Sequence, residues 1–512
     1  MARMENCKGT DTRRFTRREL LGRTAAISGF VALPWIIPSS VRSADGNVAP
    51  SERITVGLIG KGLMGSGHLR RLVGDRDVQV LAVCDVDRLR CEDGKRRVEE
   101  TYAAPPWADS SGTAVRRPRA EYHGCAAYND YRELLGRADI DAVVIVTPDH
   151  WHTLQTIDAV KAGKDVYCEK PITITVREGR RLVEAVRRYG RIFQTGTQYR
   201  SIPTIRQVCE FVRSGGLGKV KQVFTLWSRL GGFFGAPRFK PYRHLMDVEN
   251  SGNSYVPLDI TLPAEPVPEG LDWDLWVGPS LWHPYNPAYH KNPSPGVVPW
   301  SFCEDFGAAS VTWHHSHSAD VIQYALGAEN SGPVELIHPS TGAPAFAGAS
   351  LYPRKRGYPT LTCKYANGTL LHLVDNWSMV KEVYKAVPAT ARLAGNFGGV
   401  FVGERGWVTS MSTGGPVEGG PEKLFEEMKL RTRQVNIGEN NHHANWFECI
   451  RTRQRPSCDE EIGHRSASLG HLVIIAHKLQ RSLKWDPVKE EFPGDEVANR
   501  LLFRAMRAPW RI

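Results

Sequence analysis

A glycine-rich motif directly follows an apolar, β-branched segment near the start of the chain. The run Ile54–Ile59 predicts a buried strand, and Gly60, Gly62 and Gly65 follow it with the spacing G-x-G-x-x-G. In this motif the first glycine allows a tight turn, the second lets the backbone approach a pyrophosphate, and the third lets a helix pack closely on the strand. The phosphate lies at the N-terminus of that helix, where free N–H groups favour an anion. These residues predict a dinucleotide-binding α/β domain.

An acidic residue ends the next predicted strand. Asp85 lies twenty-five residues after Gly60 and is suited to accept hydrogen bonds from ribose hydroxyls. Its negative charge would repel a 2′-phosphate, which favours NAD over NADP, although Arg88 keeps NADP open. Together with the glycines, Leu63 and Met64 complete the predicted cofactor-binding loop.

Strand and helix signals alternate between residues 53 and 172. We expect parallel strands joined by helices, which is a Rossmann-type doubly wound parallel sheet. The stretch 103–120 contains paired prolines and predicts an insertion loop. The other predicted elements are strands at Ile54–Ile59, Val78–Cys84, Ala142–Val146 and Asp165–Cys168, and helices at Ser66–Val73, Tyr131–Leu135 and Trp151–Ala162.

The rest of the chain predicts a second, α+β domain with a large open mixed sheet. A stretch rich in Pro, Gly and aromatic residues, 232–300, has few periodic runs and is typical of a functional loop region. We place a dinucleotide-binding domain at 50–172 and a C-terminal domain at 173–512. The second domain is predicted to contain a helix from Thr175 to Tyr189, strands at Lys219–Leu226, Thr360–Tyr365 and Thr369–Val374, and helices at Asn441–Arg453 and Ser466–Leu479.

Residues 1–44 read as an export signal. Arg17 and Arg18 precede the apolar stretch Ala25–Ile37, whose 13 residues are too few for a membrane span and typical of a signal peptide. Twin-arginine signals are read by the Tat translocon, which carries folded proteins. We therefore expect a periplasmic protein that binds its cofactor before export and has no stable membrane span.

Charge and cysteine content exclude two function classes. The chain has a formal net charge of +11, but beyond residue 44 it holds 58 Lys and Arg against 52 Asp and Glu. No basic run is interleaved with aromatic residues, so we expect no nucleic-acid binding. The ten cysteines show no paired spacing, which argues against a disulfide framework.

Two polar motifs follow predicted strands, where open α/β sheets bind ligands. Thr147, Pro148 and His152 belong to the first motif, and Glu169 and Lys170 to the second. The first motif also fits an ordinary helix start, and each histidine in it fits a structural role. A lysine at the end of a strand is commonly exposed to solvent, so these residue types alone leave the function open.

The ordered set of motifs resembles the family of glucose–fructose oxidoreductase, inositol dehydrogenase and MocA. It includes the glycine motif, Asp85, Thr147–His152, Cys168–Pro171 and Trp313–Asp320. The resemblance implies a C-terminal domain whose open sheet mediates homo-oligomerisation, and a carbohydrate or polyol substrate. It further implies that Thr147, Pro148, His152, Glu169 and Lys170 border the cofactor and that Lys170 acts catalytically near the nicotinamide.

The later motif departs from the family pattern. His317 corresponds to a catalytic histidine with Asp320 three residues on, but Trp313 stands where many relatives carry an aspartate. A metal site of His314, His315 and His317 is not expected, because a helix places His315 away from the other two. The alternative is that His314, Asp320 and Trp276 contact a polyol, although Trp276 also fits a hydrophobic core.

These features predict an NAD(P)-dependent oxidoreductase that acts on a carbohydrate or polyol hydroxyl by hydride transfer. The first alternative is a redox-neutral, NAD-dependent glycosidase or sugar-modifying lyase, which oxidises a hydroxyl, eliminates across the acidified neighbouring C–H bond and returns the hydride. The second is a non-catalytic nucleotide-binding protein, which the missing aspartate at Trp313 suggests.

Overall fold

The computed structural model of the chain describes residues 53–103, 107–108, 114–115, 124–226, 259, 261–291, 299–313, 315–338, 361–374, 376–395, 397–411, 417–432 and 441–512. The predicted export signal, most of the first half of the stretch 232–300 and His314 lie outside these residues. Where an insertion loop was expected, two short strands, β3 (Trp107–Ala108) and β4 (Ala114–Val115), pair with each other.

The first sheet has six parallel strands. In chain order they are β1 (Ile54–Ile59), β2 (Val78–Cys84), β5 (Ala126–Tyr128), β6 (Ala142–Ile145), β7 (Asp165–Cys168) and β8 (Phe193–Thr195). Their spatial order is β5-β2-β1-β6-β7-β8, so the direction of progression reverses beside β1. Ligands of such sheets bind beyond the carboxyl ends of the strands at this reversal. The sheet continues past residue 172, because β8 pairs with β7.

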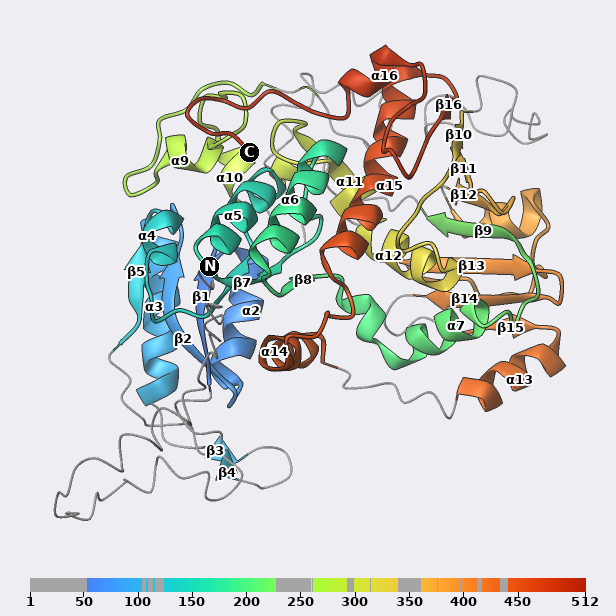
Figure 1. Cartoon of the computed structure of the whole chain (residues 1–512), viewed down its shortest axis with the longest axis horizontal. Coiled ribbons are helices and arrows are strands. Elements are labelled where there is room, and N and C mark those ends of the chain that lie inside the picture. The colour runs from blue at the N-terminus through green and yellow to red at the C-terminus, as the bar shows by residue number, and fades with distance from the viewer. Residues whose placement is uncertain are drawn as a thin grey trace, which may run out of the picture.

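Helices cover both faces of this sheet, which confirms the predicted doubly wound fold (Figure 1). One apolar cluster joins the strands to α4 (Tyr131–Leu135), α5 (Asp149–Lys161) and α6 (Val176–Tyr189). The other face packs against α2 (Leu63–Gly74), α3 (Arg88–Ala103) and α14 (His442–Thr452). Helix α14 comes from far along the chain and brings two histidines to the first sheet.

The second sheet is mixed, as predicted. Its order is β15-β14-β13-β9-β12-β11-β10-β16. The pairing of β9 with β12 is parallel, and the other pairings in the described residues are antiparallel. An apolar cluster joins its strands to α7 (Pro203–Arg213), α12 (His315–Leu326), α13 (Glu422–Thr432) and α15 (Glu460–Leu479). The strands are β9 (Val220–Leu226), β10 (Glu335–Ile337), β11 (Thr362–Lys364), β12 (Leu370–Val374), β13 (Gly398–Gly403), β14 (Trp407–Met411), β15 (Gly419–Gly420) and β16 (Leu483–Lys484).

Several helices begin earlier than the sequence pattern indicates. Helix α2 starts at Leu63, directly after Gly62, and α15 starts at Glu460 because Asp459 caps it by accepting from the N–H groups of Glu461 and Ile462. A capping aspartate thus defines the N-terminus of α15, whereas Gly62 makes no side-chain cap hydrogen bond at the start of α2.

The described residues of the segment 261–313, which are 261–291 and 299–313, have little regular structure and close over one end of the first sheet. It contains α9 (Trp273–Val277), α10 (Pro287–His290) and α11 (Ala309–Trp313), and an aromatic cluster of its own packs around Phe306. Its backbone bonds directly to the first domain: Arg88 N donates to Gly270 O at 2.9 Å, and Asp272 N donates to Val86 O at 3.0 Å. Figure 1 shows α9 and α10 beyond the ends of the strands, over the region where a ligand is expected.

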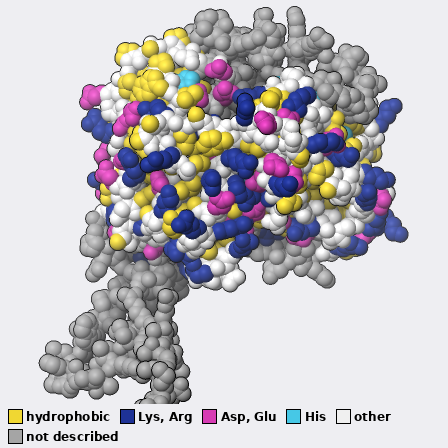
Figure 2. Space-filling model, turned by 45° about the horizontal axis from the view of Figure 1, so that its top comes forward, with side chains coloured by type: hydrophobic (Ala, Val, Ile, Leu, Met, Phe, Trp, Pro, Cys, Tyr) yellow, Lys and Arg dark blue, Asp and Glu magenta, His cyan; other side chains and the backbone are white. Residues whose placement is uncertain are grey.

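Two further features are the hydropathy of the helices and the distribution of charge on the surface. In the described part of the chain, no helix is both long enough and apolar enough to cross a bilayer. On the face drawn in Figure 2, the basic side chains are interspersed with acidic ones.

Candidate active site

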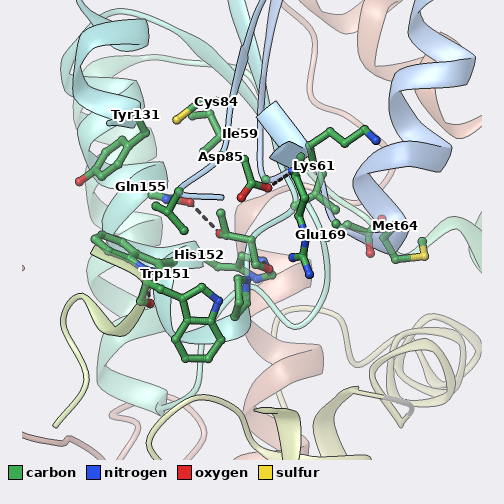
Figure 3. Close-up of a pocket in the computed structure, with 18 of the residues that line it drawn as sticks. Ile59, Lys61, Met64, Cys84, Asp85, Tyr131, Trp151, His152, Gln155 and Glu169 are labelled. Atoms are coloured by element: carbon green, nitrogen blue, oxygen red, sulfur yellow. Dashed lines mark hydrogen bonds between the residues drawn. The ribbon is translucent and has the colours of Figure 1, made fainter. Parts of the chain in front are cut away.

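A cavity of about 500 Å³ lies at the carboxyl ends of the parallel strands, where the strand order reverses (Figure 3). This volume falls in the range of small-molecule and cofactor sites. The cavity brings together most of the predicted cofactor residues: its lining includes Gly60, Gly62, Leu63, Met64, Asp85, Thr147, Pro148, His152, Glu169 and Lys170, together with Trp276 and Trp300 from the segment 261–313.

The glycine loop has the geometry of a phosphate cradle. Gly60 has a φ of +92°, and a Cβ there would lie 2.7 Å from the backbone of Val146. At Gly65 a Cβ would lie 2.0 Å from the carbonyl oxygen of Gly60, so the helix could not approach the strand. Gly62 has no neighbour within 4 Å of a Cβ position, which leaves the N-terminus of α2 open toward the cavity. The loop therefore fits a pyrophosphate bound by backbone N–H groups.

Asp85 is held firmly beside this loop. Its Oδ2 accepts from Lys61 N at 2.7 Å and its Oδ1 accepts from Asp87 N at 2.9 Å. Burial raises the pKa of Asp85, and Arg90 together with these hydrogen bonds opposes the rise. Arg88, which the sequence left as a partner for a 2′-phosphate, contacts Glu269 at 3.5 Å instead. A fixed carboxylate at this position suits ribose hydroxyls.

The two histidines of the first motif connect chain segments around the cavity. His152 lies between two carbonyl oxygens, with Nδ1 2.7 Å from Pro171 O and Nε2 2.7 Å from Thr147 O. His150 contacts Trp276 O at 3.0 Å and Phe306 O at 3.2 Å, so it ties α5 to the covering segment. Burial lowers the pKa of both imidazoles, that of His150 to about 3. Both residues hold the walls of the cavity in place.

Lys170 lies at the cavity with two carboxylates beside it. Burial lowers the pKa of Lys170, and the nearby charges of Glu169 and Asp149 oppose this effect. Asp149 is 1% exposed, and burial raises its pKa while Lys170 opposes the rise. Sequence reasoning missed Asp149 because it was interpreted as part of a helix start. The available signal was an acidic residue directly after a strand in a ligand-binding motif.

Glu169 accepts hydrogen bonds from two side chains. Its Oε1 accepts from His68 Nε2 at 2.9 Å and from Gln198 Nε2 at 2.6 Å. Burial alone would raise the pKa of Glu169, but the hydrogen bond from His68, followed by the charges of Lys170 and His317, lowers it to about 2. Glu169 is therefore ionised at neutral pH.

The residues predicted from the later motif lie apart from the cavity lining. His317 is buried on α12, with its ring centroid 4.5 Å from that of Tyr199, and its charge affects the pKa of Glu169. Asp320 accepts from Arg200 through both oxygens, at 2.6 and 2.9 Å, in the core of the second domain. Trp276 does line the cavity, and its indole stacks on Trp273 at a centroid distance of 4.5 Å.

One group of three side chains in the described part of the chain has metal-ligating atoms within 4.8 Å of one another: His283, Cys303 and Asp305. His283 Nε2 already bonds to Asp305 Oδ2 at 2.7 Å. None of the three lines the cavity.

Comparison with known proteins places both domains. One family model, described as "Oxidoreductase family, NAD-binding Rossmann fold", matches residues 54–197, and a second, "Oxidoreductase family, C-terminal alpha/beta domain", matches residues 417–512. The chain is similar in fold to the WlbA dehydrogenase of Chromobacterium violaceum, solved with NADH and UDP-GlcNAcA. The TM-score is 0.50 at 15% identity, covering 86% of this chain and 98% of that one.

Curated relatives of two kinds match parts of the chain. It is 35% identical over 155 residues to an alpha-N-acetylgalactosaminidase of Shewanella oneidensis, which is 30% of each protein. It is 29% identical over 168 residues to the inositol 2-dehydrogenase of Salmonella typhimurium, covering 32% of this chain and 43% of that protein. The chain thus matches less than half the length of these relatives. With one model matching an NAD-binding Rossmann domain and another a C-terminal α/β domain, the chain is similar to the Gfo/Idh/MocA oxidoreductase family over residues 54–197 and 417–512.

Proposed function

We propose that the chain is an NAD-dependent oxidoreductase that transfers hydride from a hydroxyl-bearing carbon of a carbohydrate or polyol, with Lys170 handling the hydroxyl proton. One observation carries the proposal: buried Lys170, which interacts with the charges of Glu169 and Asp149, lines the same cavity as the glycine loop and Asp85. The residue proposed to move the proton, Lys170, and the loop proposed to bind the hydride-accepting nucleotide thus line the same cavity.

The site chemistry follows from the ionisation of Lys170. Hydride leaves a carbinol carbon readily only when the hydroxyl proton is removed, and a lysine is a base only when neutral. Burial lowers the pKa of Lys170, which increases its neutral fraction. The amine Nζ takes the O–H proton as the C–H bond breaks and the C=O bond forms. Glu169 and Asp149 then stabilise the ammonium, and bound NAD supplies the hydride acceptor.

The substrate class rests on the covering segment and the relatives. Trp276 and Trp300 line the cavity and offer flat apolar faces, which suit the C–H faces of sugars and cyclitols. The inositol dehydrogenase among the relatives acts on a compound of this class. We assign His317 as the second proton-handling residue, since it is buried within electrostatic reach of Glu169.

A redox-neutral glycosidase or lyase is the second candidate. It is supported by the 35% identity to an alpha-N-acetylgalactosaminidase and by Trp313 at the position where an aspartate was expected. In this chemistry the oxidised sugar carbon acidifies the neighbouring C–H bond, elimination follows, and the hydride returns to the sugar. Lys170 handles the same proton in both schemes.

The proposal also includes export of the protein to the periplasm. Arg17 and Arg18 would direct the folded, cofactor-loaded protein through the Tat translocon to the periplasm, where the open second sheet would mediate homo-oligomerisation. Backbone hydrogen bonds from the segment 261–313 to the first domain would help retain the nucleotide. Replacing Arg17 and Arg18 by Lys should leave the protein in the cytoplasm, and mature protein found outside the inner membrane would rule out this signal.

The function is tested on protein purified after export. Denaturation should release nearly one NAD(H) per chain. Sugars, glycosides and polyols are then added while the near-ultraviolet absorbance of the reduced nicotinamide is recorded. A net absorbance change indicates a dehydrogenase, and product without net change indicates the redox-neutral enzyme. No response to any compound would favour a non-catalytic nucleotide-binding protein.

A further inference from the structure

A line of hydrogen-bonded side chains leads from Glu169 to the surface. His68 Nε2 lies 2.9 Å from Glu169 Oε1, and His68 Nδ1 lies 3.0 Å from His443 Nε2. His443 Nδ1 lies 3.3 Å from Nη1 of Arg71. His68 and Arg71 belong to α2, whereas His443 belongs to α14, almost four hundred residues away in sequence. Both histidines are buried, and Arg71 is exposed.

The chemistry of arginine fixes the direction of every bond in this line. A guanidinium only donates hydrogen bonds, so His443 Nδ1 must accept from Arg71. Burial lowers the pKa of His443 to about 2, so the ring is neutral and its one proton sits on Nε2. His443 Nε2 therefore donates to His68 Nδ1. His68 in turn carries its proton on Nε2 and donates to Glu169 Oε1.

The packing around the line leaves it little freedom. The His443 ring stacks on Tyr167 at a centroid distance of 4.6 Å and an interplanar angle of 10°. Glu169 lies against Gly196, where a Cβ would come within 2.7 Å of its Oε1. Gln198 donates to the same oxygen. Rotation of either imidazole would thus break contacts on both sides of it.

We propose that Arg71, His443 and His68 form a positioning relay that keeps Glu169 ionised and thereby sets the ionisation of Lys170. The relay deepens the proposed function and rests on Lys170 as the proton-handling residue. An ionised carboxylate beside a buried lysine favours the ammonium form, so the relay works against the effect of burial. The other titratable groups that interact with Glu169 or Lys170 include Asp149, His152, Tyr167, Cys168, His317 and His442.

The first test does not depend on activity. Nitrogen-15 NMR of histidine-labelled protein reports which ring nitrogen carries the proton, and the variants His68→Gln and His443→Gln assign the two signals. The relay predicts that each ring carries its proton on Nε2 and none on Nδ1. A proton on Nδ1 of either ring would overturn the bond directions and with them the relay.

The second test measures the pH dependence of turnover on the substrate found above. His443→Phe keeps a ring against Tyr167 but cannot donate, so Glu169 loses support and the pKa of Lys170 falls. The acidic limb of the profile should shift to lower pH by about one unit. Arg71→Met, at an exposed position, should shift it the same way by less and covers the case in which His443→Phe does not fold.

The matched control is His372→Phe, which removes an equally buried histidine from β12 of the second sheet and should leave the limb in place. If Lys170→Ala retains turnover, the proposed function fails while the tautomer result stands by itself. If turnover requires Lys170 but the acidic limb of the pH profile does not shift in His443→Phe or Arg71→Met, the relay is wrong and the proposed function is still supported.

Discussion

A buried aspartate in each domain differs from the other in its hydrogen-bond partners. Asp320 on α12 is fully buried, and Arg200 donates to both of its oxygens. Asp149, at the edge of the first sheet, is as deeply buried, but its Oδ2 has no hydrogen-bond partner within the described ranges. Buried polar groups are normally satisfied, and exceptions concentrate at functional sites. The second domain therefore uses its charge for structure, whereas the first leaves charge available beside the cofactor cradle.

The lysines of the first domain repeat this contrast. Lys164 is buried at the opposite end of β7 from Lys170, and its ammonium donates to the carbonyl oxygens of Arg137 and Ile140, the latter at 2.8 Å. Lys170 instead lines the cavity next to two carboxylates. Both lysines are thus buried, but we assign a structural role to Lys164 and a proton-handling role to Lys170.

Replacing each lysine in turn tests this difference in role and gives the largest expected effect. Lys170→Ala should lower turnover by about three to four orders of magnitude, because Lys170 is the residue assigned to take the hydroxyl proton in the cavity. The nucleotide should remain bound, since the glycine loop and Asp85 are intact. Turnover and nucleotide released on denaturation are measured together.

Lys164→Ala is the matched control for this experiment. It should lower stability and leave turnover per folded molecule near that of the original protein. Comparable turnover in both variants would show that burial of a lysine, rather than its place at the cavity, explains any loss.

The aspartates provide the next largest contrast. Asp320→Ala removes two hydrogen bonds from the buried Arg200 guanidinium and leaves Glu329 as its ion-pair partner, which should cost about 3 kcal/mol of unfolding free energy. Asp149→Asn removes an incompletely paired charge while keeping the shape, so it should leave stability unchanged or raise it and should lower turnover. Urea denaturation and turnover of both variants check this. The contrast collapses if Asp149→Asn is the more destabilising of the two.

As pH falls, protonation of Glu169 and protonation of Asp149 should change the unfolding free energy in opposite directions. The pKa of Glu169 falls from 4.5 to about 2 on folding, so its contribution is complete above the unfolded pKa and is lost as pH drops between these values. This shift corresponds to about 3 kcal/mol. Asp149 has a raised pKa, so protonating it in acid removes an unfavourable buried charge and stabilises the folded protein instead. Unfolding free energy measured against pH should fall less steeply in Glu169→Gln, and an unchanged slope would contradict the assignment.

Sequence patterns predicted the parts of the site that depend on neighbouring residues. The glycine loop, Asp85, Glu169 and Lys170 each follow a strand directly, and parallel strands bring their carboxyl ends to one edge. What could not be predicted arises from contacts between distant segments. Asp320 meets Arg200, and His443 on α14 reaches His68 on α2, only because the chain returns to each domain after a long excursion. No local periodicity encodes either pairing.

Hydride transfer to the bound nucleotide tests the central claim most directly. The purified protein is incubated with carbon-deuterated polyols and sugars, and the nucleotide released on denaturation is analysed by mass spectrometry. The account predicts deuterium on the nicotinamide in the original protein and none in Lys170→Ala, although both release the same amount of nucleotide. Equal deuterium in the two proteins, or a nucleotide and products free of transferred deuterium with every compound, would contradict it.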